Sequence, residues 1–133
     1  MKKDPRVYLA HFLECAGRIE RYLKGGQEAF LGETMTQDAV IRNFEIIGEA
    51  AKRIPEDYRR KYPSLPWSLM AGFRDLLIHD CEGVDLKRVW KIAVQDLPPV
   101  KEAIAKILPP LDQLERELAG EEDTGAEGGK RLS

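Results

Sequence analysis

Apolar residues recur at steps of three and four along most of the chain, the spacing that places side chains on one face of an α-helix. The first such stretch follows Asp4 and Pro5, a typical helix start. A second begins at "TMTQ", where Thr34 and Gln37 match a capping box, and continues to Pro55. Two long amphipathic helices joined by a loop are therefore expected in the first half of the chain.

Prolines divide the second half. Residues 55–66, "PEDYRRKYPSLP", predict a short turn of helix and an extended connection. A third helix is expected from Trp67, and Asp85 is the predicted cap of a fourth. The proline pairs at 98–99 and 109–110 must kink or break the helices around them, because proline donates no amide hydrogen.

These patterns predict an all-α protein, an up-and-down helical bundle of four to five main helices, since no segment alternates with a period of two. The predicted domain covers residues 1–119. Residues 120–133 are acidic and glycine-rich and have nothing to bury, so a flexible tail is expected. No apolar run is long enough to cross a membrane and no signal peptide is evident, which favours a cytoplasmic protein.

The charge balance argues against a protein that holds nucleic acid through a broad positive field. The formal net charge is -2, and residues 1–119 carry 19 charges of each sign. Any RNA site must therefore be a local concentration of cations. The candidates are Lys52, Arg53, Arg59, Arg60, Lys61 and Arg74. The two cysteines, Cys15 and Cys81, lack the spacing of a zinc site, and Cys15 is expected in the core.

The stretch "FRDLLIHDC", residues 73–81, places three polar residues in an otherwise apolar helix. Asp75 and His79 are four positions apart, so the carboxylate can reach the imidazole and fix its tautomer. Arg74 and His79 are five positions apart, or about 140° around an ideal helix, and do not share a face. They can converge if the helix unwinds near His79, or, more simply, if a second copy of the chain brings its own set across a twofold axis.

A structural interpretation of the same residues stands beside this one. A histidine in the last turn of a helix is favoured by the helix dipole, and Asp75 could form an ordinary surface pair with it. Arg74 could simply be solvated. Taken alone, the R-x4-H spacing is weak evidence of function, because both residue types are common.

Four stretches together are more specific: "DPRVYLAHFLECAGRIERYLKG", "AVIRNFEIIGEAAKRIP", "PSLPWSLMAGFRDLLIHD" and "VDLKRVWKIAVQDLPPVKEAIAKIL". They resemble the HepT-like branch of the HEPN superfamily, small helical bundles found in prokaryotic toxin–antitoxin pairs. The resemblance runs from residue 4 to about residue 108. It implies a ribonuclease toxin that acts as a homodimer without a metal or other cofactor, cleaves RNA such as tRNA or mRNA, and is paired with a nucleotidyltransferase antitoxin of the MNT type.

The resemblance also implies roles for the motif residues. It maps the catalytic arginine onto Arg74, the following polar residue onto Asp75 and the histidine onto His79. Cleavage without a metal uses the 2′-hydroxyl as nucleophile, so one group must move protons and one cation must hold the developing phosphate charge. His79 suits the first task and Arg74 the second. Asp75 would orient His79.

One position departs from the family pattern. HepT-like proteins often read H-x-Y, and the partner nucleotidyltransferase silences the toxin by attaching AMP to that tyrosine. This chain has Cys81 there, so the acceptor hydroxyl is missing. Cys81 could be modified in its place, although a small apolar residue that fills space is the more economical interpretation.

Two further groups of residues allow both a functional and a structural interpretation. Glu45 and Glu49 lie one turn apart and could bind a metal, but they have no histidine at a ligand spacing, which favours a polar helix face. Gly48 between them would let another helix approach closely. Tyr58 and Tyr62, interleaved with the cations of residues 59–61, could stack on single-stranded RNA or could simply pack on the surface.

The sequence thus supports two hypotheses from different classes. The first is the ribonuclease toxin, with Arg74, Asp75 and His79 at a dimer cleft. The second is a non-catalytic helical dimer that binds a nucleotidyltransferase partner or a nucleotide, which the near-neutral charge and Cys81 make credible.

Overall fold

The computed structural model describes residues 4–78 and 85–126, with the backbone alone at 75–78, 111 and 121–126. Within these residues every regular element is a helix. In chain order the elements are α1 (Pro5–Tyr22), α2 (Gln27–Gly32), α3 (Thr34–Lys52), α4 (Glu56–Lys61), α5 (Trp67–Ile78), α6 (Leu86–Lys91), the π-helix η1 (Ile92–Asp96), α7 (Leu97–Ile107) and α8 (Leu111–Ala126). The predicted all-α bundle is confirmed.

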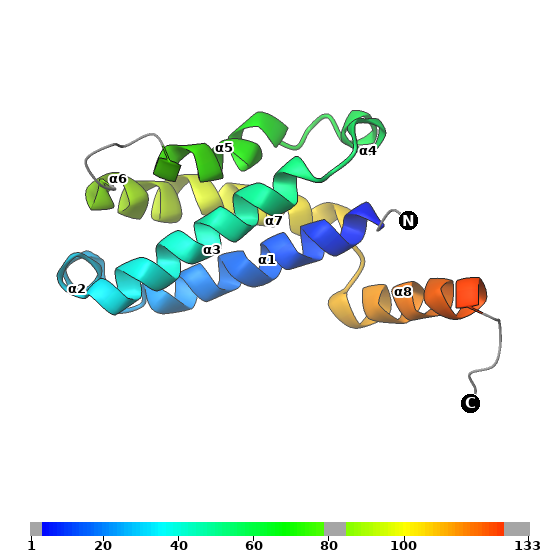
Figure 1. Cartoon of the computed structure of the whole chain (residues 1–133), viewed down its shortest axis with the longest axis horizontal. Coiled ribbons are helices and arrows are strands. Elements are labelled where there is room, and N and C mark those ends of the chain that lie inside the picture. Colours follow the sequence, from blue (N-terminus) through cyan, green and yellow to red (C-terminus); the bar gives the residue numbers. More distant parts are fainter. Residues whose placement is uncertain (1–3, 79–84, 127–133) are drawn as a thin grey trace.

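The long helices α1 and α3 lie side by side along the length of the bundle (Figure 1). Helix α5 packs against α3, and α7 packs against α1. The short helices α2 and α4 lie at opposite ends of α3, where each fills a connection (Figure 1). Helix α5 therefore meets the rest of the fold mainly through α3, and that interface sets the position of Arg74.

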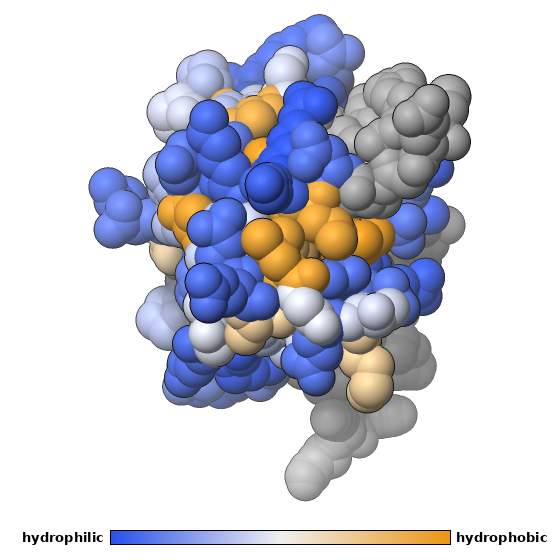
Figure 2. All heavy atoms as spheres, turned by 90° about the vertical axis from the view of Figure 1, so that its left-hand side faces the viewer, coloured by the Kyte–Doolittle hydropathy of each residue, from blue (hydrophilic) through white to orange (hydrophobic). Residues whose placement is uncertain are grey.

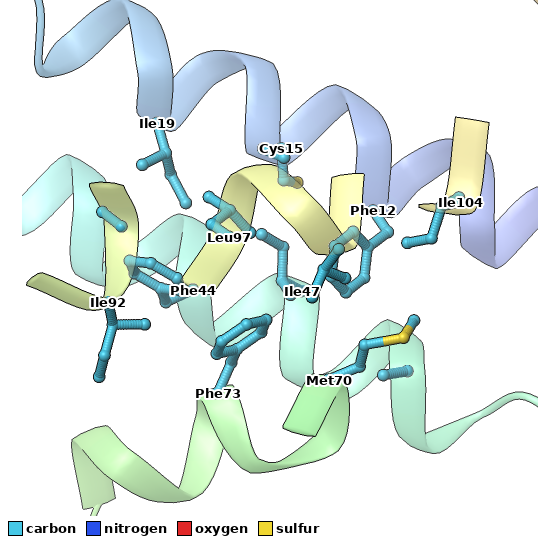
Figure 3. Close-up of a cluster of buried hydrophobic side chains, with 14 of the residues drawn as sticks. Phe12, Cys15, Ile19, Phe44, Ile47, Met70, Phe73, Ile92, Leu97 and Ile104 are labelled. Carbon is cyan, nitrogen blue, oxygen red and sulfur yellow. The ribbon is translucent and has the colours of Figure 1, made fainter. Parts of the chain in front are cut away.

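Three phenylalanines from α1, α3 and α5 form the centre of the core (Figure 3). The ring of Phe73 lies 6.3 Å from that of Phe12 and 5.6 Å from that of Phe44, and all three side chains are buried. Cys15 is also buried, as the sequence predicts, and burial raises the pKa of its thiol. The core thus joins the first, second and third long helices around Phe73.

The helix starts are only partly those that the sequence predicts. Asp4 accepts a hydrogen bond from the Arg6 amide at 2.9 Å, so the first cap is confirmed. The capping box at Thr34 and Gln37 is wrong: Glu33 is the cap, and the Gln37 side chain donates to the carbonyls of residues 30 and 31, both at 3.0 Å. Gln37 therefore binds the last carbonyl groups of a helix that the sequence pattern does not predict.

That helix is α2, where the sequence predicts a loop. It buries Phe30, whose ring lies 5.9 Å from that of Trp90 on α6. Gly26 precedes it with a φ of 96°, a conformation that glycine adopts without strain. The six-residue helix has too few apolar positions to show a period, and the burial of Phe30 and the hydrogen bonds from Gln37 stabilise it.

The proline pair at 98–99 interrupts the helix in a particular way. Neither ring can donate to the carbonyls four residues earlier, those of Val94 and Gln95. The segment before the prolines forms the π-helix η1, in which the Leu97 amide donates to the Ile92 carbonyl five residues earlier. The prolines then occupy the first turn of α7, where a missing amide hydrogen matters least. The predicted break is thus a local widening of a continuous helical segment.

The C-terminal helix α8 extends away from the bundle (Figure 1). Its Leu114 is buried, and an ion pair of 2.7 Å between Arg6 Nη1 and Glu117 Oε1 ties the helix to α1. The helix continues to Ala126, past the predicted domain end at Ala119. Extending an existing helix is much easier than starting one, so these residues can be helical without a packed face. No helix among the described residues is long and apolar enough to span a membrane.

We expect Phe73→Ala to lower the free energy of unfolding by about 3–5 kcal/mol, because the substitution leaves a cavity between three helices. Leu69→Ala on the same helix is the control: Leu69 is 40% exposed, and the expected loss is below about 1 kcal/mol. Urea unfolding followed by circular dichroism, at one fixed protein concentration, checks both. Equal losses for the two variants would contradict the described core.

Candidate active site

The arginine of the R-x4-H motif stands where α3 and α5 come closest. A Cβ placed on Gly48 would overlap the Arg74 Cβ and would lie only 2.7 Å from the Arg74 amide nitrogen. Both contacts are far shorter than van der Waals separation, so only glycine fits at this position. The predicted close approach at Gly48 is confirmed, and the helix that approaches is the one that carries the motif.

The Arg74 side chain is held by a carboxylate from the opposite helix. Its Nε forms an ion pair with Glu49 Oε2 at 2.5 Å. The two side chains are 35% and 47% exposed, so the pair lies at the edge of the bundle and is open to solvent. Arg74 is thus neither buried nor freely solvated: it is a surface cation whose backbone and side chain are both fixed by α3.

The other motif residues are only partly within the described structure. The backbone of Asp75 belongs to α5, directly after Arg74. His79 and Cys81 lie outside the described residues, as does the side chain of Asp75. Helix α5 ends at Ile78, so His79 is the next residue of the chain. Convergence of Arg74 with His79, and the proposed role of Asp75, therefore stay predictions.

The residues of α3 around Glu49 divide between two faces. Glu45 and Lys52 lie one turn before and one turn after the contact with α5, and Glu45 is half-buried. Asn43 points into the protein: it is buried, and its amide donates to the Ala39 carbonyl at 2.8 Å. Among the described residues its Oδ1 has no hydrogen-bond partner. Asn43 is five positions, or about 140°, from Gly48 and does not border the Arg74 edge.

The carboxylates of Glu45 and Glu49 also offered a metal site. The Glu49 carboxylate is paired with Arg74 instead. In residues 4–74, 85–110 and 112–120, whose side chains the structure describes, no group of three potential metal ligands comes together. The geometry therefore favours a role of Glu49 toward the arginine.

The predicted RNA-binding cations have unequal surroundings. Arg59 donates from Nε at 3.0 Å to the carbonyl of Ile54, in the connection between α3 and α4, and Arg60 pairs with Glu56 at 3.2 Å. Lys52, Arg53 and Lys61 have exposed side chains. Arg59 and Arg60 thus have identified partners, and the exposure of Lys52, Arg53 and Lys61 makes these three further candidates for contacts to phosphates.

Tyr58 and Tyr62, the aromatic pair beside these cations, each pack one side against the core. The rings of Tyr58 and Tyr62 are 5.0 Å apart, and both side chains are half-buried against the core. Burial and the neighbouring Tyr62 raise the pKa of Tyr58 to about 12. The Tyr62 carbonyl also accepts from the Trp67 indole at 2.9 Å. Packing explains both tyrosines, and stacking on RNA stays a prediction.

Comparison with known proteins gives the class to which this fold and motif belong. Residues 12–107 match the family model described as Ribonuclease HepT-like. The chain belongs to the HepT-like ribonuclease family.

Individual relatives agree with this assignment. A Thermococcus cleftensis protein named "Probable ribonuclease HepT" is 43% identical over 80% of this chain and 98% of its own length. A Caldanaerobacter subterraneus protein named "Putative RNase TTE0752" is 38% identical over 80% of this chain and 96% of its own. No solved structure was found to match.

A longer relative shows that the domain also occurs as part of a larger protein. A Methanocaldococcus jannaschii protein named "Gamma-glutamylcyclotransferase and putative RNase MJ0434" is 46% identical over 85% of this chain. The chain spans about half of that protein, 51% of its length.

Sequence reasoning singled out Arg74 and Gly48 but did not connect Glu49 with Arg74. The two residues are 25 positions apart, and helical periodicity says which residues share a face without saying which helix that face meets. The signal that could have found the pair is Gly48 itself. A glycine in mid-helix beside an acidic residue marks a close crossing where a cation on the other helix can be held.

We expect Gly48→Ala to destabilise the protein by about 1–3 kcal/mol, because the added methyl group must push α5 away from α3. Gly72→Ala on α5 is the matched control: nothing lies within 4 Å of the place that its Cβ would occupy. There the higher helix propensity of alanine should stabilise by up to about 1 kcal/mol. Thermal unfolding measures both. Stabilisation by both substitutions would show that α3 and α5 are not in close contact.

Proposed function

We propose that this protein is a metal-independent ribonuclease in which Arg74 and His79 cleave the RNA backbone. The observation that carries the proposal is the position of Arg74: a partly exposed cation, fixed by a glycine contact and a carboxylate, in a chain that belongs to the HepT-like ribonuclease family. The glycine contact fixes the backbone and Cβ at position 74, and Glu49 holds the guanidinium group that extends from it.

The proposed reaction uses the RNA's own 2′-hydroxyl. His79 removes the hydroxyl proton, and the 2′-oxygen attacks the adjacent phosphorus. The bond to the 5′-oxygen of the next nucleotide breaks, and that oxygen takes up a proton. The products are a 2′,3′-cyclic phosphate and a 5′-hydroxyl end. Negative charge grows on the non-bridging oxygens during the attack, and Arg74 stabilises it. Asp75, four positions before His79, orients the imidazole.

The proposed active form is a homodimer. Arg74 and His79 are five positions apart, so a continuous helix would turn them about 140° from each other, and a second copy supplies the simplest route to one shared site. Figure 2 shows apolar side chains at the centre of the end of the molecule where α2 and α6 lie, with hydrophilic ones around them. Helix α5 ends at this same end (Figure 1). An apolar surface beside the end of the motif helix supports a subunit contact there.

The proposed biological role is the toxin of a two-gene module whose antitoxin is a nucleotidyltransferase. Relatives named as ribonucleases support the enzymatic half of this proposal. Cys81 replaces the tyrosine that such a partner would modify, so neutralisation would require binding or another acceptor. Lys52, Arg53 and Lys61 are exposed and would contact the RNA away from the cleaved bond. If the protein cleaves no RNA, a non-catalytic dimer that binds the partner or a nucleotide becomes the better hypothesis.

We expect the purified protein to cleave single-stranded RNA in the presence of EDTA and to spare an oligonucleotide with a 2′-deoxy residue at the cleaved position. Arg74→Ala should reduce kcat by about 10²–10³-fold and His79→Ala by about 10²–10⁴-fold. Arg18→Ala is the control, because Arg18 forms an ordinary pair with Glu14 along α1. Circular dichroism verifies folding. Cleavage that survives both motif substitutions, or that needs a metal, would overturn the proposal.

A shared site makes a separate prediction for mixed dimers. Arg74→Ala and His79→Ala subunits, each inactive alone, should recover activity when unfolded together and refolded. Half of the randomly assembled dimers are mixed, and each mixed dimer keeps one intact pair of residues out of two, so about a quarter of wild-type activity is expected. Gel electrophoresis of the RNA products measures the recovery. Without recovery in refolded, dimeric mixtures, the site does not combine residues from two subunits.

A further inference from the structure

The ion pair between Glu49 and Arg74 uses one particular edge of the guanidinium group. Glu49 Oε2 meets Nε, the nitrogen nearest the Arg74 backbone. The Nη1 and Nη2 groups lie at the outer end of the guanidinium group, and among the described residues Arg74 forms an ion pair with no residue other than Glu49. An arginine held in this way keeps its two outer nitrogens for the paired oxygens of a phosphate.

We infer that Glu49 is a positioning residue, which orients the Arg74 guanidinium so that its outer nitrogens meet the phosphate of the scissile bond. This inference rests on the proposed function, because it assigns Glu49 a part in the same reaction. It goes beyond that function by naming a residue outside the R-x4-H motif, on a different helix, through which Arg74 acts.

The need for such a residue follows from the surroundings of Arg74. The Gly48 contact fixes the Arg74 backbone and Cβ, but four side-chain torsions separate the backbone from the guanidinium group. With 35% of the side chain exposed, packing alone does not restrict these torsions to one arrangement. A carboxylate on Nε restricts them before the substrate arrives, so less freedom is lost when the phosphate binds.

The negative charge of Glu49 distinguishes a residue that positions Arg74 from one that attracts the RNA. Glu49 is an anion beside the cation that should bind an anionic substrate, so its charge opposes RNA binding. Removing it should leave KM for RNA unchanged or lower. Its benefit must therefore appear in kcat, where a misplaced guanidinium weakens stabilisation of the transition state. A residue that served only binding or only stability would give a different division between the two constants.

The chain offers a matched ion pair outside the site. Lys101 Nζ meets Glu20 Oε1 at 2.6 Å and joins α7 to α1, as Arg74 joins α5 to α3. Its side chains are 35% and 42% exposed, close to the values of the Arg74 pair. Loss of Glu20 thus reproduces the loss of a partly exposed interhelical pair without a change at Arg74.

The experiment compares Glu49→Ala, Glu49→Gln and Glu20→Ala in RNA cleavage with EDTA present. Glu49→Ala should lower kcat on the order of 10–100-fold, without a rise in KM. Glu49→Gln keeps an oxygen that accepts from Nε, so its kcat should lie between those of Glu49→Ala and the wild type. Glu20→Ala should leave both constants within about twofold, because it changes only a partly exposed pair. The thermal unfolding temperatures of Glu49→Ala and Glu20→Ala should change by similar amounts.

A second measurement tests the geometry without activity. In nitrogen-15 NMR the Nε–H of Arg74, assigned by its absence in Arg74→Lys, should exchange slowly with water in the wild type and rapidly in Glu49→Ala. An active wild type whose kcat is unaffected by Glu49→Ala, or whose KM rises in place of the fall in kcat, would overturn the inference while the proposed function stands. A wild type that cleaves no RNA would overturn the proposed function, and with it this role of Glu49, whatever the exchange rate.

Discussion

The contact between Gly48 and the backbone of Arg74 is the constraint on which both the core and the candidate site depend. It brings α5 against α3 at a separation that a single methyl group would prevent. Neighbouring residues of α5 then point in different directions from this contact. Phe73 enters the core between Phe12 and Phe44, and Arg74 stays at the surface edge of the same interface. Because successive helical residues are about 100° apart, fixing one of these side chains fixes the other.

A guanidinium group at such an edge is partly removed from water, and a partly desolvated charge is stable only with a partner. Glu49 is that partner, and its place beside Gly48 makes it available wherever the close contact forms. The interaction itself adds little to stability, since about 0–1 kcal/mol is usual for exposed pairs. Its importance lies in orientation. The same reasoning explains how a chain with a net charge of -2 can serve an anionic substrate: the useful charge is local and held in place.

The sequence predicts the helices well where periodicity is long, as in α1, α3 and α5, and where a cap is local, as at Asp4 and Asp85. It fails where the deciding contact comes from elsewhere in the chain. Helix α2 forms because Phe30 meets Trp90, 60 positions later, and Gln37 serves the carbonyls of that helix and not the start of its own. The pairing of Glu49 with Arg74 is missed for the same reason. Local patterns fix which residues share a face, whereas the partner of each face follows from packing.

The cations near α4 show how packing also narrows a functional hypothesis. Five basic residues there form one patch in the sequence, yet Arg59 donates to the Ile54 carbonyl after α3 and Arg60 pairs with Glu56. Arg59 is held through Nε alone and Arg60 by an exposed pair, so a phosphate would meet the remaining nitrogens of Arg59 or compete with Glu56 for Arg60. In the proposed function, the exposed side chains of Lys52, Arg53 and Lys61 would contact RNA most readily at this end of α3. Since exposed cations bind backbone phosphates without reading bases, this surface would hold an RNA strand while Arg74 meets the bond that is cut.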